Sequence, residues 1–260
     1  MLKRRLIPKL QLGIMPSYRG PKGVLVVTRQ FGNIRAIGNP LSQAKIYEAQ
    51  LADELILVDL VRTNESWEVL LECLENMSEN LATPLSVGGG ISSFDQVQEL
   101  LNRGADKIII NTAALENPKL IEDVANSYGR QCVVVSIDVR SNNDEWEIYS
   151  DGGKKSTGLL PVAWSKQVVK YGAGEIMITS IDRDGTGTGL ELDLINKISS
   201  SVTVPIIASG GCGLAQHFVE GFDSGAAAVA AGTFFSQRDQ NPMQCRSHIR
   251  NAGHPIRLEV

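Results

Sequence analysis

Two glycine-rich motifs end apolar runs in this 260-residue chain. The first, VGGGI, contains Gly88 to Gly90, and the second, SGGCG, runs from Ser209 to Gly213. Glycine has no side chain in the way, so backbone N–H groups in such a motif can close on an anion. One glycine after a strand is usually only a turn, but a matching pair is more specific. The pair predicts two phosphate sites.

Each glycine motif has a neighbour of similar chemistry, INT after one apolar run and AAGT after another. A helix that starts at such a point adds partial positive charge. Two sites of this kind on opposite sides predict a long substrate with a phosphate at each end. The residues that this reasoning assigns to phosphate binding are Gly89, Gly90, Asn111, Thr112, Gly210, Gly211 and Gly232.

The elements that must position these residues alternate between strands and helices. Amphipathic stretches such as PLSQAKIYEAQL and FDQVQELLNRG separate apolar runs of strand length. These runs are RLIPKL, ELILVDL, PLSVGG, KIIIN, CVVVSID, EIMITSID, PIIASGG and AAVAAGT. Eight such units in about 250 residues predict an α/β fold of the (β/α)8 type, a TIM barrel, whereas a doubly wound open sheet usually has fewer strands. We expect residues 1–260 to form one domain.

Two further segments interrupt this alternation. GIMPSYRGPKGVLVVTRQFGN follows the first predicted strand, and RSNNDEWEIYSDGGKKSTG follows the fifth. Both follow the carboxyl ends of strands, which is the side where barrels build their active sites.

An internal repeat supports the barrel. Glu54 and Glu175 begin similar runs 121 residues apart, and Pro84 and Pro205 begin two more with the same separation. RGAD and SGAA also differ by 121 residues. Unrelated βα units would not keep one spacing over three elements, so we predict two similar half-barrels fused in tandem.

Composition narrows the class of protein. A formal charge of −4 gives no basic field for nucleic acid. No apolar run is long enough to span a bilayer or to act as a signal peptide. The four cysteines are widely spaced and the three histidines lack metal-site spacing, so we expect a reduced, cytoplasmic protein without a metal or another cofactor.

The motifs ADELILVDL, VGGGI, RGADKIIINTAALENP, VVVSIDVR, GAGEIMITSIDRDGTGTG and PIIASGG resemble the cyclase subunit of imidazole glycerol phosphate synthase. This subunit is the barrel half of a glutamine amidotransferase in histidine biosynthesis, and the likeness runs almost from end to end. The resemblance implies a carbon–nitrogen lyase that closes an imidazole ring on a bisphosphorylated ribonucleotide. It also implies a separate glutaminase that docks at the N-terminal face of the barrel and sends ammonia along the barrel axis.

The resemblance assigns a channel entrance to four charged residues, Arg5, Glu54, Lys107 and Glu175. Each lies at or near the start of a predicted strand, where alternation can point it into the barrel. Two acids and two bases should neutralise one another there. The residues alone also fit an ordinary salt-bridge cluster that closes the barrel floor.

The resemblance further implies two catalytic carboxylates at opposite strand tips, acting as general acid and base. Asp138 fills the position on the fifth strand, but the position on the first strand is Gln11. An amide cannot exchange a proton near neutral pH. Loss of a general acid or base usually costs roughly 10²- to 10⁴-fold in rate, so we expect weakened cyclase turnover.

Other residues of the predicted mouth have plainer interpretations. The family has a lysine in the loop after the first strand, where this chain has Val27 or Thr28. By the resemblance, Asp184 and Gly185 lie at a phosphate end of the substrate. Asp59 either lines the mouth or orders its loop.

The substitutions leave two functions open. One is a working cyclase with a rearranged first loop. The other resembles cyclase-like paralogues of surface-polysaccharide pathways, including lipopolysaccharide, in which barrel and glutaminase supply ammonia to a third protein that makes acetamidino sugars. Such a barrel needs the conduit and the docking faces but not the acid pair.

Overall fold

The computed structural model describes residues 3–18, 20–142, 145–237 and 240–257. Eight strands of this part of the chain pair in parallel and close into a barrel. Their order is β1, β4, β5, β6, β7, β10, β11 and β12, with β12 returning to β1. The (β/α)8 prediction is confirmed.

The barrel strands are β1 (Arg5–Met15), β4 (Leu55–Asp59), β5 (Leu85–Gly88), β6 (Lys107–Ile110), β7 (Val133–Asn142), β10 (Glu175–Ser180), β11 (Ile206–Ser209) and β12 (Ala228–Ala231). They are rich in β-branched residues and buried on both faces, as parallel strands covered by helices should be. Strands β1 and β7 are four places apart in the ring, so they lie opposite each other.

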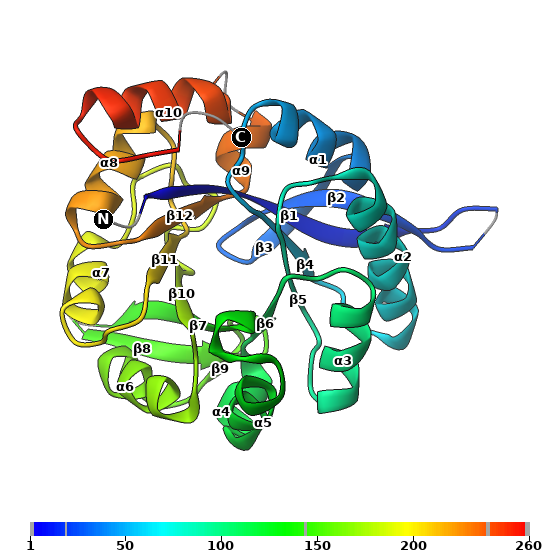
Figure 1. Ribbon diagram of the computed structural model, residues 1–260, viewed down its shortest axis with the longest axis horizontal. Coiled ribbons are helices and arrows are strands. Elements are labelled where there is room, and N and C mark those ends of the chain that lie inside the picture. Colours follow the sequence, from blue (N-terminus) through cyan, green and yellow to red (C-terminus); the bar gives the residue numbers. More distant parts are fainter. Residues whose placement is uncertain (1–2, 19, 143–144, 238–239, 258–260) are drawn as a thin grey trace.

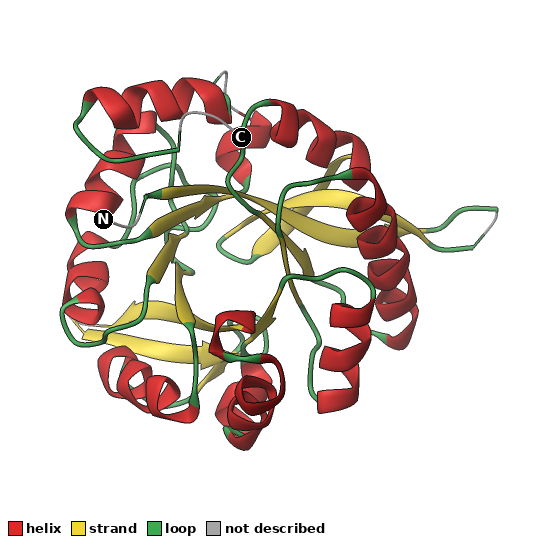
Figure 2. Ribbon diagram, viewed as in Figure 1, coloured by secondary structure: helices red, strands yellow, loops and turns green. Residues whose placement is uncertain are grey.

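Helices surround the barrel on the outside (Figures 1 and 2). They are α1 (Pro40–Ala49), α2 (Asn64–Asn80), α3 (Phe94–Asn102), α4 (Thr112–Glu116), α5 (Lys119–Tyr128), α6 (Pro161–Tyr171), α7 (Leu192–Ser199), α8 (Ala215–Asp223), α9 (Thr233–Gln237) and α10 (Pro242–Asn251), with a short 3₁₀ helix at Arg130–Cys132. Helix α2 illustrates how local sequence starts such a helix and directs one of its faces toward the barrel. Thr63 and Ser66 form a capping box at its start, and Val69, Leu70 and Leu74 bury one face.

Two hairpin excursions extend opposite barrel strands. Strands β2 (Lys22–Arg29) and β3 (Gly32–Gly38) add antiparallel strands to β1, and β8 (Glu145–Ser150) and β9 (Lys155–Ser156) add them to β7. The sequence predicted only extra segments here, and a first strand that ends at Gln11. The strand continues to Met15 because the β-branched run after Gly23 pairs with it, and the two extend together beyond the barrel (Figure 1).

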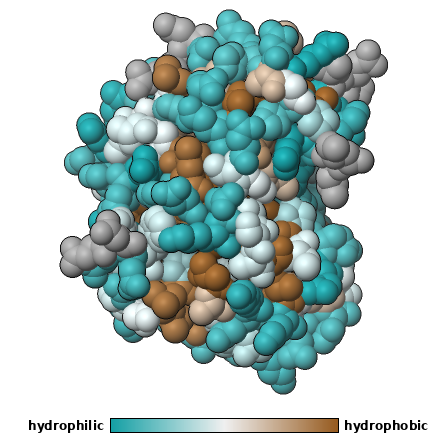
Figure 3. All heavy atoms as spheres, turned by 90° about the vertical axis from the view of Figure 1, so that its left-hand side faces the viewer, coloured by the Kyte–Doolittle hydropathy of each residue, from teal (hydrophilic) through white to brown (hydrophobic). Residues whose placement is uncertain are grey.

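The barrel interior contains its own apolar layer. Eight side chains from seven strands form a cluster separate from the main core: Ile7, Ile56, Ile109, Val134, Met177, Ile207, Ala228 and Ala230. The larger core lies between the strands and the helices. On the outer face that carries α7 and α8, hydrophobic residues are scattered among hydrophilic ones (Figure 3). Across the described residues, no helix combines the length and apolar character needed to cross a membrane.

Candidate functional site at the two ends of the barrel

A closed ring of charges forms the floor of the barrel. Arg5 donates from Nη1 to Glu54 Oε2 at 2.6 Å and from Nη2 to Glu175 Oε2 at 2.8 Å. Lys107 Nζ lies 2.8 Å from Glu54 Oε2 and 3.0 Å from Glu175 Oε1. Ser86 Oγ also donates to Glu54, at 2.6 Å. The structure therefore brings together the four residues predicted for the channel entrance, and each cation contacts both acids.

The ring stabilises the charged forms of Glu54 and Arg5. Burial alone would raise the pKa of Glu54, whose side chain is only 3% exposed, but Lys107 and Arg5 outweigh burial and hold this pKa below its ordinary value. Burial alone would lower the pKa of Arg5, but Glu175 and Glu54 outweigh burial and raise this pKa above its ordinary value. The floor is thus a neutralised cluster with the apolar layer above it.

At the opposite end, Gln11 belongs to a hydrogen-bonded chain that crosses the mouth. Its side chain is buried and donates from Nε2 to Thr28 Oγ1 at 3.1 Å, and Thr28 Oγ1 donates to Asp184 Oδ2 at 2.7 Å. Thr28 lies on β2 and Asp184 follows β10. The amide at position 11 therefore holds the first hairpin against the loop after β10.

The turn between β2 and β3 adds two hydrogen bonds between the first hairpin and the loop after β10. Gln30 donates its backbone N–H to the carbonyl of Asp184 at 2.8 Å and its side-chain amide to the carbonyl of Asp182 at 2.9 Å. Gly185 has a positive φ of 67°, and a Cβ there would overlap the backbone carbonyl of Thr28. The close approach explains why glycine stands at this position.

Asp138 is the buried acid on the other side of the mouth. Asn111 donates from Nδ2 to Asp138 Oδ2 at 2.7 Å. The pKa of Asp138 is raised to about 6, chiefly by burial and with a contribution from nearby Asp184, against the opposing effects of Lys9, Asn111 and Arg62. A carboxyl group with such a pKa exchanges protons near neutral pH. Gln11 and Asp138 lie on opposite strands and bind different neighbours.

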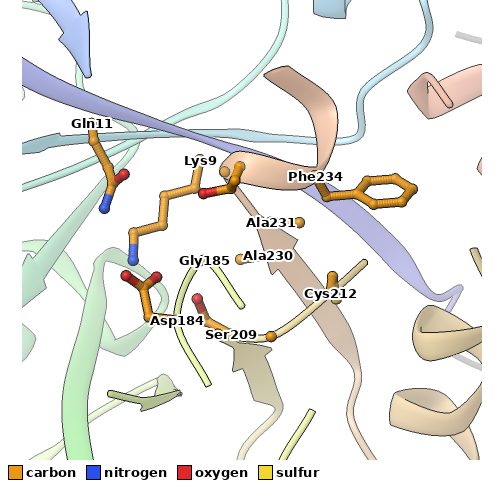
Figure 4. Close-up of a pocket in the computed structure, with 13 residues that line it drawn as sticks. Lys9, Gln11, Asp184, Gly185, Ser209, Cys212, Ala230, Ala231 and Phe234 are labelled. Atoms are coloured by element: carbon orange, nitrogen blue, oxygen red, sulfur yellow. The ribbon is translucent and has the colours of Figure 1, made fainter. Parts of the chain in front are cut away.

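Lys9 is a residue of the mouth that the sequence reasoning missed. It lies two residues before Gln11 on β1, on the same inward face, and it lines a pocket with Gln11 and Asp184. Figure 4 shows its side chain crossing this pocket toward Asp184. Side chains alternate between the two faces of β1, so the inward position of Gln11 could have identified Lys9 as another inward residue.

The C-half glycine site consists of Asp184, Gly185, Gly210, Gly211 and Gly232. All five line the same pocket as Lys9, because β11 and β12 are neighbours and the loop after β10 folds over them. The cavity volume is about 20 Å³, which is the space of one water molecule.

The N-half glycine site consists of Gly89, Gly90, Asn111 and Thr112, at the ends of the paired strands β5 and β6. Here the second excursion supplies the cover, since the N–H of Asp151 donates to Thr112 Oγ1 at 3.1 Å. The Asn111 Oδ1 atom is buried and has no hydrogen-bond partner among the described residues. A buried acceptor without a partner is typical of a site that a ligand or a bound water completes.

Asp59 orders its loop, one of the two roles considered for it. Its carboxylate accepts hydrogen bonds from the N–H groups of Val61 at 2.8 Å and Arg62 at 3.0 Å, and from Ser66 Oγ at 2.6 Å. Within the described ranges, no group of three or more His, Cys, Asp or Glu side chains is placed to hold a metal ion.

Comparisons with known proteins agree with this architecture. Residues 19–240 match the family model described as "Histidine biosynthesis protein". A protein of Prochlorococcus marinus (strain MIT 9313), provisionally named imidazole glycerol phosphate synthase subunit hisF2, is 68% identical over 260 residues, all of both chains.

Two proteins named imidazole glycerol phosphate synthase subunit HisF are more distant. The protein of Gluconacetobacter diazotrophicus is 41% identical over 99% of this chain and 97% of its own length. That of Pyrococcus furiosus is 39% identical over all of both chains. The chain therefore belongs to the family of histidine biosynthesis proteins that includes the HisF subunits of imidazole glycerol phosphate synthase.

Proposed function

We propose that this chain is the ammonia-accepting barrel subunit of a glutamine amidotransferase and that a HisH-like glutaminase docks on its N-terminal face. The observation that carries the proposal is the closed ring of Arg5, Glu54, Lys107 and Glu175 at the barrel floor. The names of the relatives, which are subunits of a synthase, agree with a role in an assembly.

The ring and the apolar layer suit the passage of neutral ammonia. A charged ammonium ion would be expensive to move through the layer of Ile7, Ile56 and Met177, whereas ammonia is small and uncharged. Because each cation of the ring bridges both acids, swinging Lys107 aside would break two ion pairs and open the floor while Arg5 keeps the acids partly neutralised.

The mouth suits a phosphorylated substrate of the cyclase type, which yields imidazole glycerol phosphate in histidine biosynthesis. The two glycine sites lie in different half-barrels, and Asp138 between them has a pKa of about 6. A group with this pKa can act as general base at neutral pH. The proposed reaction is a carbon–nitrogen lyase step that uses ammonia from the glutaminase.

A second candidate rests on Gln11. Position 11 carries an amide in place of a carboxyl group, and this amide is bonded in the chain to Thr28 and Asp184, so it offers Asp138 no acidic partner. A paralogue without cyclase activity, channelling ammonia to a third amidotransferase that makes acetamidino sugars for surface polysaccharide, needs the floor but not an acid pair.

One experiment tests the proposal and separates the candidates. The chain is purified with its glutaminase, and glutamine hydrolysis is measured with and without the barrel, together with turnover of the bisphosphorylated formimino ribonucleotide. Failure to bind or stimulate the glutaminase contradicts both candidates. Glutaminase binding with cyclase turnover supports the first, and glutaminase binding with background turnover supports the second.

The Gln11→Asp variant sharpens that comparison. If Gln11 limits cyclase turnover, the variant should gain roughly 10²-fold or more in rate, because it restores the second titrating group. An unchanged, already high rate would show that the first-strand carboxylate is unnecessary in this chain.

A further inference from the structure

Two arginines occupy equivalent places in the two half-barrels. Arg62 and Arg183 are separated by 121 residues, the same spacing that relates Gly90 to Gly211. A methyl group on Gly90 would lie 3.5 Å from the Cβ of Arg62, and one on Gly211 would lie 3.0 Å from the Cβ of Arg183. The side chain of each arginine therefore begins next to the equivalent glycine of the same half-barrel.

The backbone holds Arg62 in a conformation that a residue with a side chain adopts only when its surroundings require it. Its φ is 60°, in the left-handed region. The buried carboxylate of Asp59 accepts the N–H of Arg62 at 3.0 Å, and Ser66 fixes that carboxylate from α2. Such strain persists at sites where a side chain has to be aimed.

The guanidinium of Arg62 has an exchangeable partner at the N-half glycine site. It lies 3.3 Å from the carboxylate of Asp151, with the two side chains 30% and 60% exposed. An exposed ion pair of this kind contributes little. Because the N–H of Asp151 is bonded to Thr112, its carboxylate sits beside this site, where an anionic ligand would compete with it.

The two arginines differ in how firmly they are held. Arg183 Nε lies 2.8 Å from Glu191 Oε2, and Nη2 makes a second contact with the same carboxylate at 3.4 Å. In the part of the chain that the structure describes, Arg62 has one side-chain ion pair, the 3.3 Å contact with Asp151. Arg62 is therefore the arginine that can change partners.

We propose that Arg62 binds a phosphate group of the ligand at the N-half glycine site, exchanging its contact with Asp151 for two phosphate oxygens. The planar guanidinium donates to two such oxygens at once, which suits a phosphate ester better than a lone carboxylate contact. The inference rests on the phosphorylated substrate of the proposed function and adds the residue that fixes one end of it.

The test is a titration of the full-length, ¹⁵N-labelled chain with inorganic phosphate, followed by NMR at the amides of Gly90 and Gly211. These two amides report separately on the N-half and C-half sites. We expect Arg62→Met to weaken the response at Gly90 by about tenfold or more and to leave Gly211 unchanged, because a hydrogen bond to a charged group is lost. Arg62→Lys should recover part of the affinity.

Two further variants control for charge and for folding. Arg103→Met removes an exposed arginine at the carboxyl end of helix α3, where it pairs with Glu75 at 2.7 Å, and should leave both amides unaffected. Asp151→Asn removes the competing carboxylate and should tighten binding at Gly90 by about threefold to tenfold.

Each outcome decides the inference. Equal affinity at Gly90 in Arg62→Met and the wild type, an equal loss in Arg103→Met, or weaker binding in Asp151→Asn would overturn it, as would a wild type that shows no response at Gly90. Glutaminase binding, measured on the same samples, is independent of all these results, so it distinguishes failure of this inference from failure of the proposed function.

Discussion

Glu54, directly before β4 at the floor of the barrel, and Asp138, on β7 at its mouth, are both buried carboxyl groups, yet their surroundings shift their pKa values in opposite directions. Two cations and a hydroxyl contact Glu54 and lower its pKa. Among the described residues, Asp138 accepts a side-chain hydrogen bond from one amide, that of Asn111, and burial is the main cause that raises its pKa to about 6. The floor is neutralised within itself, whereas the mouth keeps a group ready to exchange protons.

The difference indicates which end is built for stability and which for chemistry. A carboxylate that is paired in the folded state stabilises the fold, and one that is desolvated without a cation in contact destabilises it. Perturbation of the second kind is typical of functional sites, where stability is sacrificed for reactivity. The following predictions test this contrast, from the largest expected effect to the smallest.

Removing one cation from the floor should cost the most. In Lys107→Met, Glu54 and Glu175 lose one of their two cations, and we expect a loss of about 3–5 kcal/mol in the free energy of unfolding, measured with denaturant. The matched control Arg103→Met breaks an exposed pair and should cost about 1 kcal/mol or less. Equal losses in the two variants would show that the floor is not a coupled cluster.

Replacing Asp138 at the mouth by a neutral residue should raise the free energy of unfolding instead of lowering it. The pKa of Asp138 rises from 3.8 to about 6 on folding, so the folded chain binds this proton more tightly than the unfolded chain. Its stability contribution is therefore lost as the pH rises through that window, and Asp138→Asn should be more stable than the wild type at pH 7 by about 3 kcal/mol. Denaturant unfolding between pH 4 and pH 7 measures this.

The same unfolding experiment also reports on Glu54 at the floor, whose effect on stability depends on pH in the opposite direction. Because the pKa of Glu54 is lowered, the stability it provides is present above its ordinary value of 4.5 and is lost as the pH falls below it. Stability that depends on pH identically in the wild type and in Asp138→Asn would contradict the contrast between the two ends.

Breaking the chain across the mouth should have an intermediate effect. Thr28→Val keeps the shape of the side chain but leaves Gln11 Nε2 and Asp184 Oδ2 without their partner, and we expect a loss of about 1–3 kcal/mol in unfolding free energy. Thr203→Val, at an exposed threonine, serves as control and should change stability by about 0.5 kcal/mol or less. No difference between them would mean that the hairpin is held without this chain.

The smallest expected effect concerns a single pKa. Lys9 opposes the rise in the pKa of Asp138, so Lys9→Met should raise that pKa further, as followed by ¹³C NMR of the Asp138 carboxyl group. Lys45→Met, on the outer helix α1, should leave it unchanged. A lowered pKa in Lys9→Met would show that the ammonium group does not face the mouth.

Much of the barrel could be predicted from local pattern. The eight apolar runs, the 121-residue spacing and the inward alternation of Arg5, Glu54, Lys107 and Glu175 are properties of short segments, and parallel strands in a closed barrel place such segments in register. The same logic applied to β1 would have added Lys9, which shares the inward face with Arg5 and Gln11.

The partners of the mouth residues could not be predicted in this way. Thr28 is 17 residues from Gln11 and 156 from Asp184, and their contact depends on how far β1 and β2 pair beyond the barrel. Likewise, Arg62 meets Asp151 only because the second excursion turns back over β6. Contacts between loops of different strands depend on loop length and path, which alternation does not specify.

The sequence by itself determined the half-barrel repeat, the two glycine sites and the four charges of the floor, because each follows from a period of two along a strand or from a glycine at a strand end. Only the tertiary structure decided that Gln11 links the first hairpin to the loop after β10, that Asp138 is a buried acid with a raised pKa, and that Arg62 lies beside Gly90. The physical reason is that burial and pairing are properties of surroundings, and those surroundings come from segments far away in the chain.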